Sequence, residues 1–193
     1  MQTKDVLVLL TEQWADWEAG YAMAGVNSAP QYVVKTIAAD KQPKTSIGGM
    51  KAVIDYAIEE YQCLNNLAML ILPGSFSWAE NDGPEIVAFI KAARSKDIPV
   101  AAICGATIYL ARQGFLDDVK HTGDTFDFFE NLPGYNGKHN YVLAQAVSQG
   151  GFITANETAA LEFAREISLM LKIDTDENIE EWYNAFKNGM VVS

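Results

Sequence analysis

The sequence predicts an α/β fold in which helices cover both faces of a parallel sheet. Short apolar runs alternate with stretches of helical periodicity along the chain, and the connections between them are short. The first of these runs, residues 6–10, is apolar throughout, which is typical of a strand buried on both faces. No internal repeat or linker divides the chain, so we expect residues 1–193 to form a single domain.

The first half of the chain contains one predicted helix and two further strands. The helix covers residues 15–26 and is expected to break near Gly25. Turn residues fill the segment 40–49. Residues 52–56 fit either a strand or the start of a helix, and periodicity does not decide between them. The two strands cover residues 32–38 and 67–72, and Pro73-Gly74 closes the second.

The second half alternates in the same way. Residues 84–95 predict a helix, because Pro84 suits its first position and either Asp82 or Gly83 can cap it. A strand then leads into Cys104, and a helix follows to about Gln113. Downstream, the patterns predict a short aromatic helix at 125–132, strands at 141–147 and 152–155, a helix at 157–172 capped by Asn156, and a last helix at 178–187.

Composition excludes several classes of protein. With a net charge of −11, the chain lacks the basic surface that nucleic-acid binders and polybasic membrane proteins need. No apolar run is long enough to span a membrane, and the first residues do not read as a signal peptide. Cys63 and Cys104 are the only cysteines, which gives neither a disulfide framework nor the spacing of a metal site. We therefore expect a cytoplasmic protein without a bound metal.

Cys104 is the strongest candidate for a reactive residue. It stands where an apolar strand ends and a helix begins, with Ala102 and Ala106 two residues to either side. A nucleophile on such a sharp turn needs small neighbours, because the backbone there is crowded and strained. The N–H groups and dipole of the following helix would favour a thiolate. The alternative is an inert buried cysteine, and Cys63, in a connecting segment, is not expected to react.

Three strand ends are expected to meet at one edge of the sheet, where open parallel sheets bind ligands. They are the stretch 11–18, the turn after residue 72, and the Cys104 turn. A carboxyl such as Glu18 can donate to a nearby sulfur when protonated or act as a base when ionised. The backbone N–H groups of Ser75 and Gly105 are candidates for an oxyanion hole. Glu18 also fits a plain helix-start acid, and a Pro-Gly pair after a strand is often only a turn.

Together these residues resemble the ThiJ/PfpI superfamily. The resemblance implies a flavodoxin-like, Rossmann-like sandwich, related to class I glutamine amidotransferases and usually dimeric, with no cofactor. It implies that Cys104 is the nucleophile and Glu18 its partner acid, with Gly74, Ser75 and Gly105 as the oxyanion-side backbone. The similarity runs from the first strand to the helix after residues 152–155. It is carried by Asp16-Trp17-Glu18, Leu72-Pro73-Gly74, Ala102-Ile103-Cys104-Gly105-Ala106 and Gly114-Phe115-Leu116.

The chain departs from the superfamily pattern in ways that bear on activity. Protease-like and chaperone branches carry a His directly after the cysteine, where this chain has Gly105, and Ser75 replaces the second glycine of a Pro-Gly-Gly turn. His121 falls one or two residues before the position of a catalytic His in the redox-protein branch, so a catalytic role competes with a structural one. Neither His121 nor His139 has the Glu two residues on that glutamine amidotransferases use. Classical protease and glutaminase activities are therefore disfavoured.

Three classes of function stay open at this point. The first is a cysteine-dependent hydrolase, amidase or glyoxalase-like lyase acting on a small molecule. The second is a redox-sensing or stress-response protein in which an oxidant converts Cys104 to a sulfinate beside Glu18. The third is a binding protein with an inert Cys104. We also expect a homodimer, because the superfamily is usually dimeric and because one segment is rich in aromatic residues. This segment could form a dimer surface, the wall of a pocket or part of the core. Its aromatic residues are Phe126, Phe128, Phe129 and Tyr135.

Overall fold

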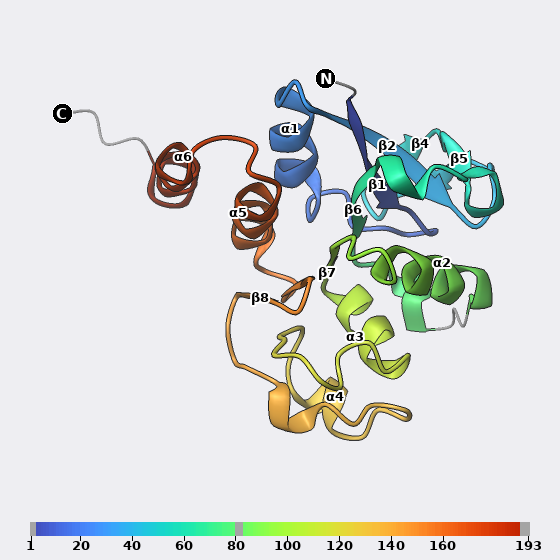
Figure 1. Cartoon of the computed structure of the whole chain (residues 1–193). Helices are drawn as coiled ribbons and strands as arrows, with labels where there is room; N and C mark the ends of the chain where they lie inside the picture. Colours follow the sequence, from blue (N-terminus) through green and yellow to red (C-terminus); the bar gives the residue numbers. More distant parts are fainter. Residues whose placement is uncertain (1–2, 80–82, 190–193) are drawn as a thin grey trace.

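The computed structural model describes residues 3–79 and 83–189 and is built around a seven-stranded sheet (Figure 1). The strand order is β5-β2-β1-β6-β7-β9-β8. All neighbours are parallel except β8 and β9, which pair antiparallel. This arrangement confirms the predicted fold class. The strands are β1 (Lys4–Leu9), β2 (Tyr32–Ala38), β5 (Tyr56–Ala57), β6 (Leu67–Leu72), β7 (Val100–Ile103), β8 (Ala146–Gln149) and β9 (Phe152–Ala155).

Helices cover both faces of the sheet (Figure 1). Alternation along β1 divides the core: Val6 and Val8 pack towards α1 and α5, whereas Leu7 and Leu9 pack towards α2 and α3. The last helix, α6, packs against α5 and α1. The helices are α1 (Gly20–Ser28), α2 (Pro84–Arg94), α3 (Gly105–Arg112), α4 (Asp127–Glu130), α5 (Ala160–Leu171) and α6 (Asp176–Asn188).

The first helix begins later than predicted. Residues 16–19 form turns and α1 starts at Gly20, because long-range bonds occupy the backbone just before it. Ala15 N donates to Gly74 O at 2.8 Å, and Ile47 N donates to Trp14 O at 2.9 Å. The predicted break near Gly25 is also wrong, since α1 continues to Ser28. The delayed start leaves residues 15–19 free to turn Glu18 towards the sheet edge.

Residues 52–56 form neither of the two predicted elements. A small hairpin of β3 (Lys44–Thr45) and β4 (Lys51–Ala52) ends there, and β5 begins only at Tyr56. Between them Val53 is 78% exposed, and Asp55 accepts a bond from Thr36 N at 2.8 Å. Side-chain bonds to the neighbouring strand thus replace a regular ladder.

Most of the predicted strand at 141–147 is wrong. β8 begins at Ala146, and the residues before it are held by bonds to the 121–122 segment. Val142 N donates to His121 O, and Thr122 Oγ1 donates to Ala144 O, both at 2.8 Å. Leu143 is 92% exposed, so an apolar residue there does not mark a buried strand.

Two helices begin at other residues than predicted, whereas α2 begins behind one of its two predicted caps. The Asn156 side chain accepts from Thr158 N in a turn, so α5 begins only at Ala160 and Glu157 precedes it. Thr175 caps α6 by accepting from Asn178 N, which moves its start to Asp176. Gly83 is the N-cap of α2, and Asp82, the other candidate, lies outside the described residues.

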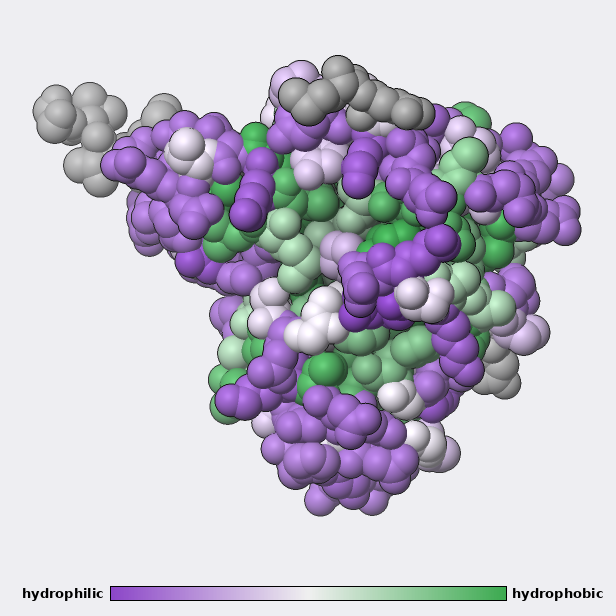
Figure 2. Space-filling model, in the orientation of Figure 1, coloured by the Kyte–Doolittle hydropathy of each residue, from purple (hydrophilic) through white to green (hydrophobic). Residues whose placement is uncertain are grey.

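Much of the face seen in the space-filling view is hydrophilic (Figure 2). In the space-filling view, hydrophilic residues occupy the periphery of this face, while hydrophobic ones gather towards its centre (Figure 2). Over residues 3–79 and 83–189, no helix has the length and apolar character that crossing a bilayer requires.

Candidate active site

Cys104 stands on the turn between β7 and α3. Its φ of 58° and ψ of −136° lie in a region that costs a residue with a side chain about 1–3 kcal/mol. Neighbouring bonds hold this conformation: Cys104 N donates to Ala155 O at 3.0 Å, and Thr107 Oγ1 donates to Cys104 O at 2.7 Å. Ala102 and Ala106 are fully buried, as the crowding of such a turn demands. The strand and helix therefore fix a half-buried thiol at the carboxyl edge of the sheet.

Glu18 reaches this thiol from the turn after β1. Its side chain is only 1% exposed and hydrogen-bonds to the Cys104 side chain. Gly74 N donates to Glu18 Oε2 at 2.6 Å, which fixes the carboxyl. Burial raises the pKa of Glu18 to about 7, although the bond from Gly74 acts in the opposite direction. Near neutral pH the carboxyl therefore exists in both forms that the sequence left open.

The environment of Cys104 favours the thiol over the thiolate. Burial raises the pKa of Cys104, and the negative charges of Glu18 and Asp124 raise it further. The N–H of Gly105, at the start of α3, lowers the pKa as expected of a helix N-terminus, but burial and the two acids outweigh it. The expectation that the start of the helix would favour a thiolate is thus corrected: the thiol needs a base, and Glu18 touches it.

The three candidate oxyanion residues have different roles. Gly74 N is bonded to Glu18, so this N–H positions the acid. Gly105 N hydrogen-bonds to the Cys104 sulfur. An ideal Cβ on Gly105 would lie 3.2 Å from Ser75 O and 4.0 Å from Ser75 N, so the two backbones pass side by side. The Ser75 hydroxyl donates to Glu12 O at 2.6 Å, which anchors the turn.

Gly74 is the glycine at which an added side chain would meet both Glu18 and Cys104. An ideal Cβ there would lie 2.7 Å from Cys104 Cβ and 2.9 Å from its Sγ. We expect Gly74→Ala to destabilise the fold by about 1–3 kcal/mol, because overpacking forces the elbow or Glu18 to move. Gly20→Ala is the matched control, since a Cβ there meets nothing within 4 Å. Urea unfolding of both variants checks this, and equal stabilities would contradict the close packing described above.

Both ring nitrogens of His121 hydrogen-bond to groups other than the Cys104 sulfur. Its side chain is fully buried, with Nδ1 2.8 Å from Val119 O and Nε2 2.7 Å from Tyr135 Oη. A carbonyl only accepts, so Nδ1 carries the proton and Nε2 accepts from the tyrosine. Burial lowers the pKa of His121, which keeps the ring neutral. His139 lies on the surface loop, where Nε2 is 3.2 Å from Asn140 Nδ2.

The aromatic segment is mostly core and gives little support to a dimer surface. Phe129 is fully buried and Tyr135 is 5% exposed, and both rings pack around His121. Phe126 is partly buried against the same cluster, and only Phe128 is largely exposed, at 60%.

Asp124 belongs to the site, and the sequence analysis missed it. Its carboxyl lies close enough to Cys104 and Glu157 for their side chains to affect its ionisation, and burial raises the pKa of Asp124 to about 7. In the segment that carries it, the sequence pattern indicated only a histidine as a candidate. No local pattern marks Asp124, because its position depends on how residues 121–124 pack against α3. The one available signal was a carboxyl three residues after a candidate His.

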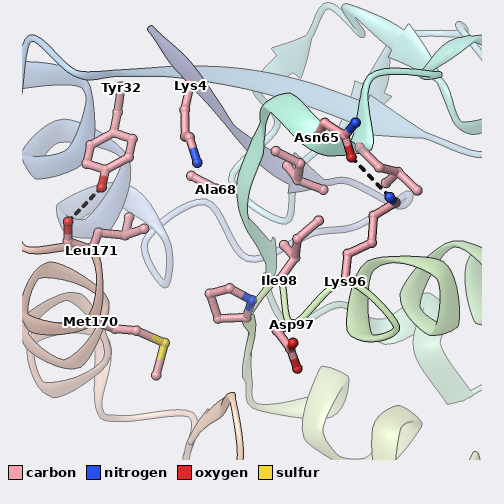
Figure 3. Close-up of a pocket in the computed structure, with 12 residues that line it drawn as sticks. Lys4, Tyr32, Asn65, Ala68, Lys96, Asp97, Ile98, Met170 and Leu171 are labelled. Atoms are coloured by element: carbon pink, nitrogen blue, oxygen red, sulfur yellow. Dashed lines mark hydrogen bonds between the residues drawn. The ribbon is translucent and has the colours of Figure 1, made fainter. Parts of the chain in front are cut away.

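A hollow lies at the opposite edge of the sheet from Cys104. It has a volume of about 580 Å³, and its lining includes Lys4, Asn65, Lys96 and Met170 (Figure 3). Lys96 Nζ donates to Asn65 Oδ1 at 3.0 Å. This hollow opens where β1, β6 and β7 begin, whereas Cys104 follows the end of β7, so the two are separate. The exposed Cys63 also lies outside the Cys104 site. Within residues 3–79 and 83–189, no cluster of three or more His, Cys, Asp or Glu side chains suits a metal ion.

Comparisons with known proteins find relatives over most of the chain. The DJ-1/PfpI family profile matches residues 4–170. The chain is 38% identical over 178 residues to "Uncharacterized protease YdeA" of Bacillus subtilis, covering 92% of this chain and 88% of that protein. It is 33% identical over 195 residues to "Uncharacterized protease YoaZ" of the same organism, covering 97% and 92%.

Solved structures agree as well. A thiJ/pfpI family protein from Bacillus anthracis matches with a TM-score of 0.89 and 35% identity, over 98% of this chain and 93% of that one. The DJ-1 superfamily protein Atu0886 from Agrobacterium tumefaciens matches with a TM-score of 0.87 and 30% identity, over 95% and 97%. With a matching profile over most of its length and relatives above 30% identity, the chain belongs to the DJ-1/PfpI family.

Proposed function

We propose that this protein is a cysteine-dependent enzyme that acts on a small carbonyl compound, as a glyoxalase-like lyase or a hydrolase of an ester or amide. The observation that carries the proposal is the contact between a protonated thiol on a strained elbow and a buried carboxyl whose pKa is raised to about 7. A base that titrates near the working pH is the partner such a thiol requires. No cofactor enters the proposal.

In the proposed first step, Cys104 Sγ attacks the carbonyl carbon. The sulfur–carbon bond forms while the S–H bond breaks, and the ionised Glu18 takes the proton. The carbonyl electron pair moves to oxygen, which the N–H groups of Ser75 and Gly105 stabilise. For an ester or amide, Glu18 then gives this proton to the leaving alcohol or amine as its bond to the carbonyl carbon breaks, and water cleaves the resulting thioester and restores the thiol.

The names of the Bacillus relatives suggest a peptide bond as one substrate. Two features favour a smaller substrate for this chain. Gly105 stands where the protease-like branches carry a His, and both ring nitrogens of His121 have other partners. Carboxyl groups are thus the acids and bases nearest the sulfur, which suits aldehydes and activated esters better than unactivated amides.

The second candidate is a redox sensor. The bond between Glu18 and Cys104 would stabilise a sulfinate if Glu18 donated to it. Oxidation by peroxide proceeds through the thiolate, however, and burial and nearby acids raise the pKa of Cys104. This electrostatic environment favours catalysis assisted by a base over direct oxidation.

Turnover of methylglyoxal, an activated ester and a peptide amide tests the proposal. We expect the wild type to consume methylglyoxal or the ester, and Cys104→Ser to fall to the uncatalysed rate. Cys63→Ser is the matched control and should retain activity. Intact mass after graded peroxide runs in parallel: oxidation of Cys104 without turnover of any substrate would favour the sensor, and turnover by Cys104→Ser would overturn the role of the cysteine.

We also propose that the chain works as a cytoplasmic homodimer. The turn after β1 lies beside the β3–β4 hairpin, because the Ser46 hydroxyl donates to the Asp16 carboxyl. Both segments carry exposed apolar side chains. Trp17 is 52% exposed and Met50 56% exposed, and burying them against a second copy would remove apolar surface from water. Light scattering should give twice the monomer mass, and Met50→Lys should lower it. A monomer at micromolar concentration would contradict this proposal.

A further inference from the structure

We propose that the β3–β4 hairpin positions Glu18 against Cys104, and that Asp16 is the positioning residue through which it does so. No residue of the hairpin takes part in the steps proposed for the sulfur, so the assignment adds a separate element to the site. The effect on turnover rests on the function proposed above, whereas the position of Glu18 can be tested without a substrate.

Asp16 stands at a corner of the turn that ends at Glu18. The N–H of Glu18 donates to Ala15 O at 3.2 Å, which closes a four-residue turn with Asp16 as its second residue. The start of this turn is fixed at the end of β6, because Ala15 N donates to Gly74 O at 2.8 Å. The direction in which Glu18 leaves the turn therefore depends on how the Asp16 corner is held.

The hairpin holds this corner through the Asp16 carboxyl. Asp16 Oδ2 accepts a bond from Ser46 Oγ at 2.5 Å and another from Gly48 N at 3.2 Å. Ser46 is itself only 4% exposed, and its hydroxyl oxygen accepts from Met50 N at 2.9 Å across the hairpin loop. One carboxyl oxygen thus joins the Glu18 turn to the loop of the hairpin.

The segment between β1 and this turn is tied to the same hairpin. Gln13 N donates to Thr45 O at 2.7 Å, and Ile47 N donates to Trp14 O at 2.9 Å. Gln13 has a φ of 56°, a strained conformation that a residue with a side chain keeps only where the surrounding structure holds it. Strain of this kind is typical of functional sites. The hairpin therefore supports both the segment that leads to the turn and the turn itself.

The position that the hairpin sets for Glu18 leaves little space for movement. Glu18 is 1% exposed, and its Oε2 accepts from Gly74 N at 2.6 Å. An ideal Cβ on Gly74 would lie 2.5 Å from this Oε2 and 2.9 Å from Cys104 Sγ, so the carboxyl and the sulfur flank the same small space. Displacing a group so close to the reacting atom by about 1 Å costs roughly 10²-fold in rate.

Three variants interrupt the coupling at different points. Asp16→Ala removes the acceptor, Ser46→Ala removes one donor, and in Gly48→Ala the new Cβ would collide with Asp16 Oδ2. Each lets Glu18 move away from Cys104. Glu18, with a pKa of about 7, is ionised where the thiol titrates, and its negative charge raises the pKa of Cys104. The pKa of Cys104 should therefore fall, by about one unit in Asp16→Ala.

Asp16→Asn separates the position of the side chain from its charge. Asparagine loses the same charge as alanine does, but its Oδ1 still accepts from Ser46 and Gly48. The thiol of this variant should behave as in the wild type. Val53→Ala, at a side chain that is 78% exposed just after the hairpin, is the control for a general loosening of this region and should also have no effect.

The experiment is the rate of iodoacetamide alkylation at pH 8, in a Cys63→Ser background and without substrate. A fall of one unit in the pKa of Cys104 should raise this rate about threefold to tenfold, because the thiolate fraction rises about tenfold while its nucleophilicity falls. We expect faster alkylation in Asp16→Ala, Ser46→Ala and Gly48→Ala, and the wild-type rate in Asp16→Asn.

A second background decides whether the effect passes through Glu18. Gly48→Ala should not change the alkylation rate further when position 18 already carries glutamine. An equal increase in that background would mean that the hairpin acts on the thiol by another route, and would overturn the proposal. The wild-type rate in Gly48→Ala would overturn it as well, and this variant decides if Asp16→Ala does not fold.

Turnover tests the catalytic effect. For a substrate that the wild type consumes, Asp16→Ala should lower kcat by roughly 10²-fold with little change in KM, and Asp16→Asn should restore it. An unchanged kcat in Asp16→Ala overturns the positioning role in catalysis. Absence of any turnover by the wild type would count against the proposed function and leave the alkylation result intact.

Discussion

Replacing Glu18 by glutamine is expected to stabilise the fold at pH 8 by about 3 kcal/mol while slowing turnover by roughly 10²-fold. Burial moves the pKa of Glu18 from 4.5 to about 7, so the folded state binds a proton more tightly than the unfolded state. Stability therefore falls as pH rises from about 4.5 through 7, and at about 1.4 kcal/mol per unit the loss reaches about 3 kcal/mol. Glutamine carries no charge, and its oxygen can still accept from Gly74 N.

The measurement is urea unfolding of the wild type and Glu18→Gln at pH 5 and pH 8. The advantage of the variant should be small at pH 5 and close to its full size at pH 8. Glu130→Gln, an exposed carboxyl on α4, is the control and should show no such dependence. An equal difference at both pH values would contradict the proton uptake assigned to Glu18.

Glu18→Asp separates the two roles of the carboxyl. A shorter side chain draws the acid away from the sulfur by about 1 Å, whereas glutamine keeps the contact and loses only the ability to take a proton. If Glu18 acts as a base, glutamine is the more damaging change for turnover. If it acts only as a donor to sulfur, aspartate is the more damaging one. Equal, wild-type activity in both variants would remove Glu18 from the site.

His121→Phe is expected to cost about 2–4 kcal/mol of stability and to leave the ionisation of Cys104 unchanged. Phenylalanine fills a similar volume but leaves the part-buried Val119 O and the buried Tyr135 hydroxyl without a partner, and a buried polar group costs about 1–3 kcal/mol when unpaired. Tyr135→Phe removes only one of these bonds and should cost about half as much. Because burial lowers the pKa of His121, the wild type should lose stability as pH falls below about 6.5, when the unfolded chain takes the proton first.

Denaturant unfolding and thiol titration of the two variants, on the same preparations, check this account. A fold of wild-type stability together with a shifted thiol titration would contradict it, and would return His121 to the catalytic group that its sequence position suggests.

The parts of the fold that the sequence predicted best are those that local pattern determines. β2, β6 and β9 have the predicted bounds because each is a compact apolar run closed by turn residues. α1 begins after its predicted first residue, because backbone groups at the predicted start hydrogen-bond to Gly74 and Ile47 instead. The strand predicted from the apolar residues near Leu143 is wrong for a related reason. That segment is held by a hydrogen bond from a side chain distant in sequence and not by pairing with a neighbouring strand.

The residues of the site also divide into those that sequence patterns predict and those that depend on tertiary packing. Cys104 and Glu18 could be predicted because an elbow needs small neighbours and because parallel strands bring their ends together. Asp124 could not, since its contact with Cys104 depends on how the irregular segment after α3 folds back. The ionisation of the thiol could not be predicted either, because the dipole of α3 is a local property whereas burial and the surrounding acids are not.

The central claim is that Cys104 rests as a thiol and that Glu18 controls its proton. The most direct test is the ultraviolet absorbance of the thiolate against pH, in a Cys63→Ser background, for wild-type and glutamine side chains at position 18. The account predicts a wild-type midpoint above the ordinary cysteine value of about 8.5 and a lower midpoint in Glu18→Gln, because the neighbouring negative charge is gone. A wild-type thiolate already formed below pH 7, with a midpoint unmoved by Glu18→Gln, would contradict it.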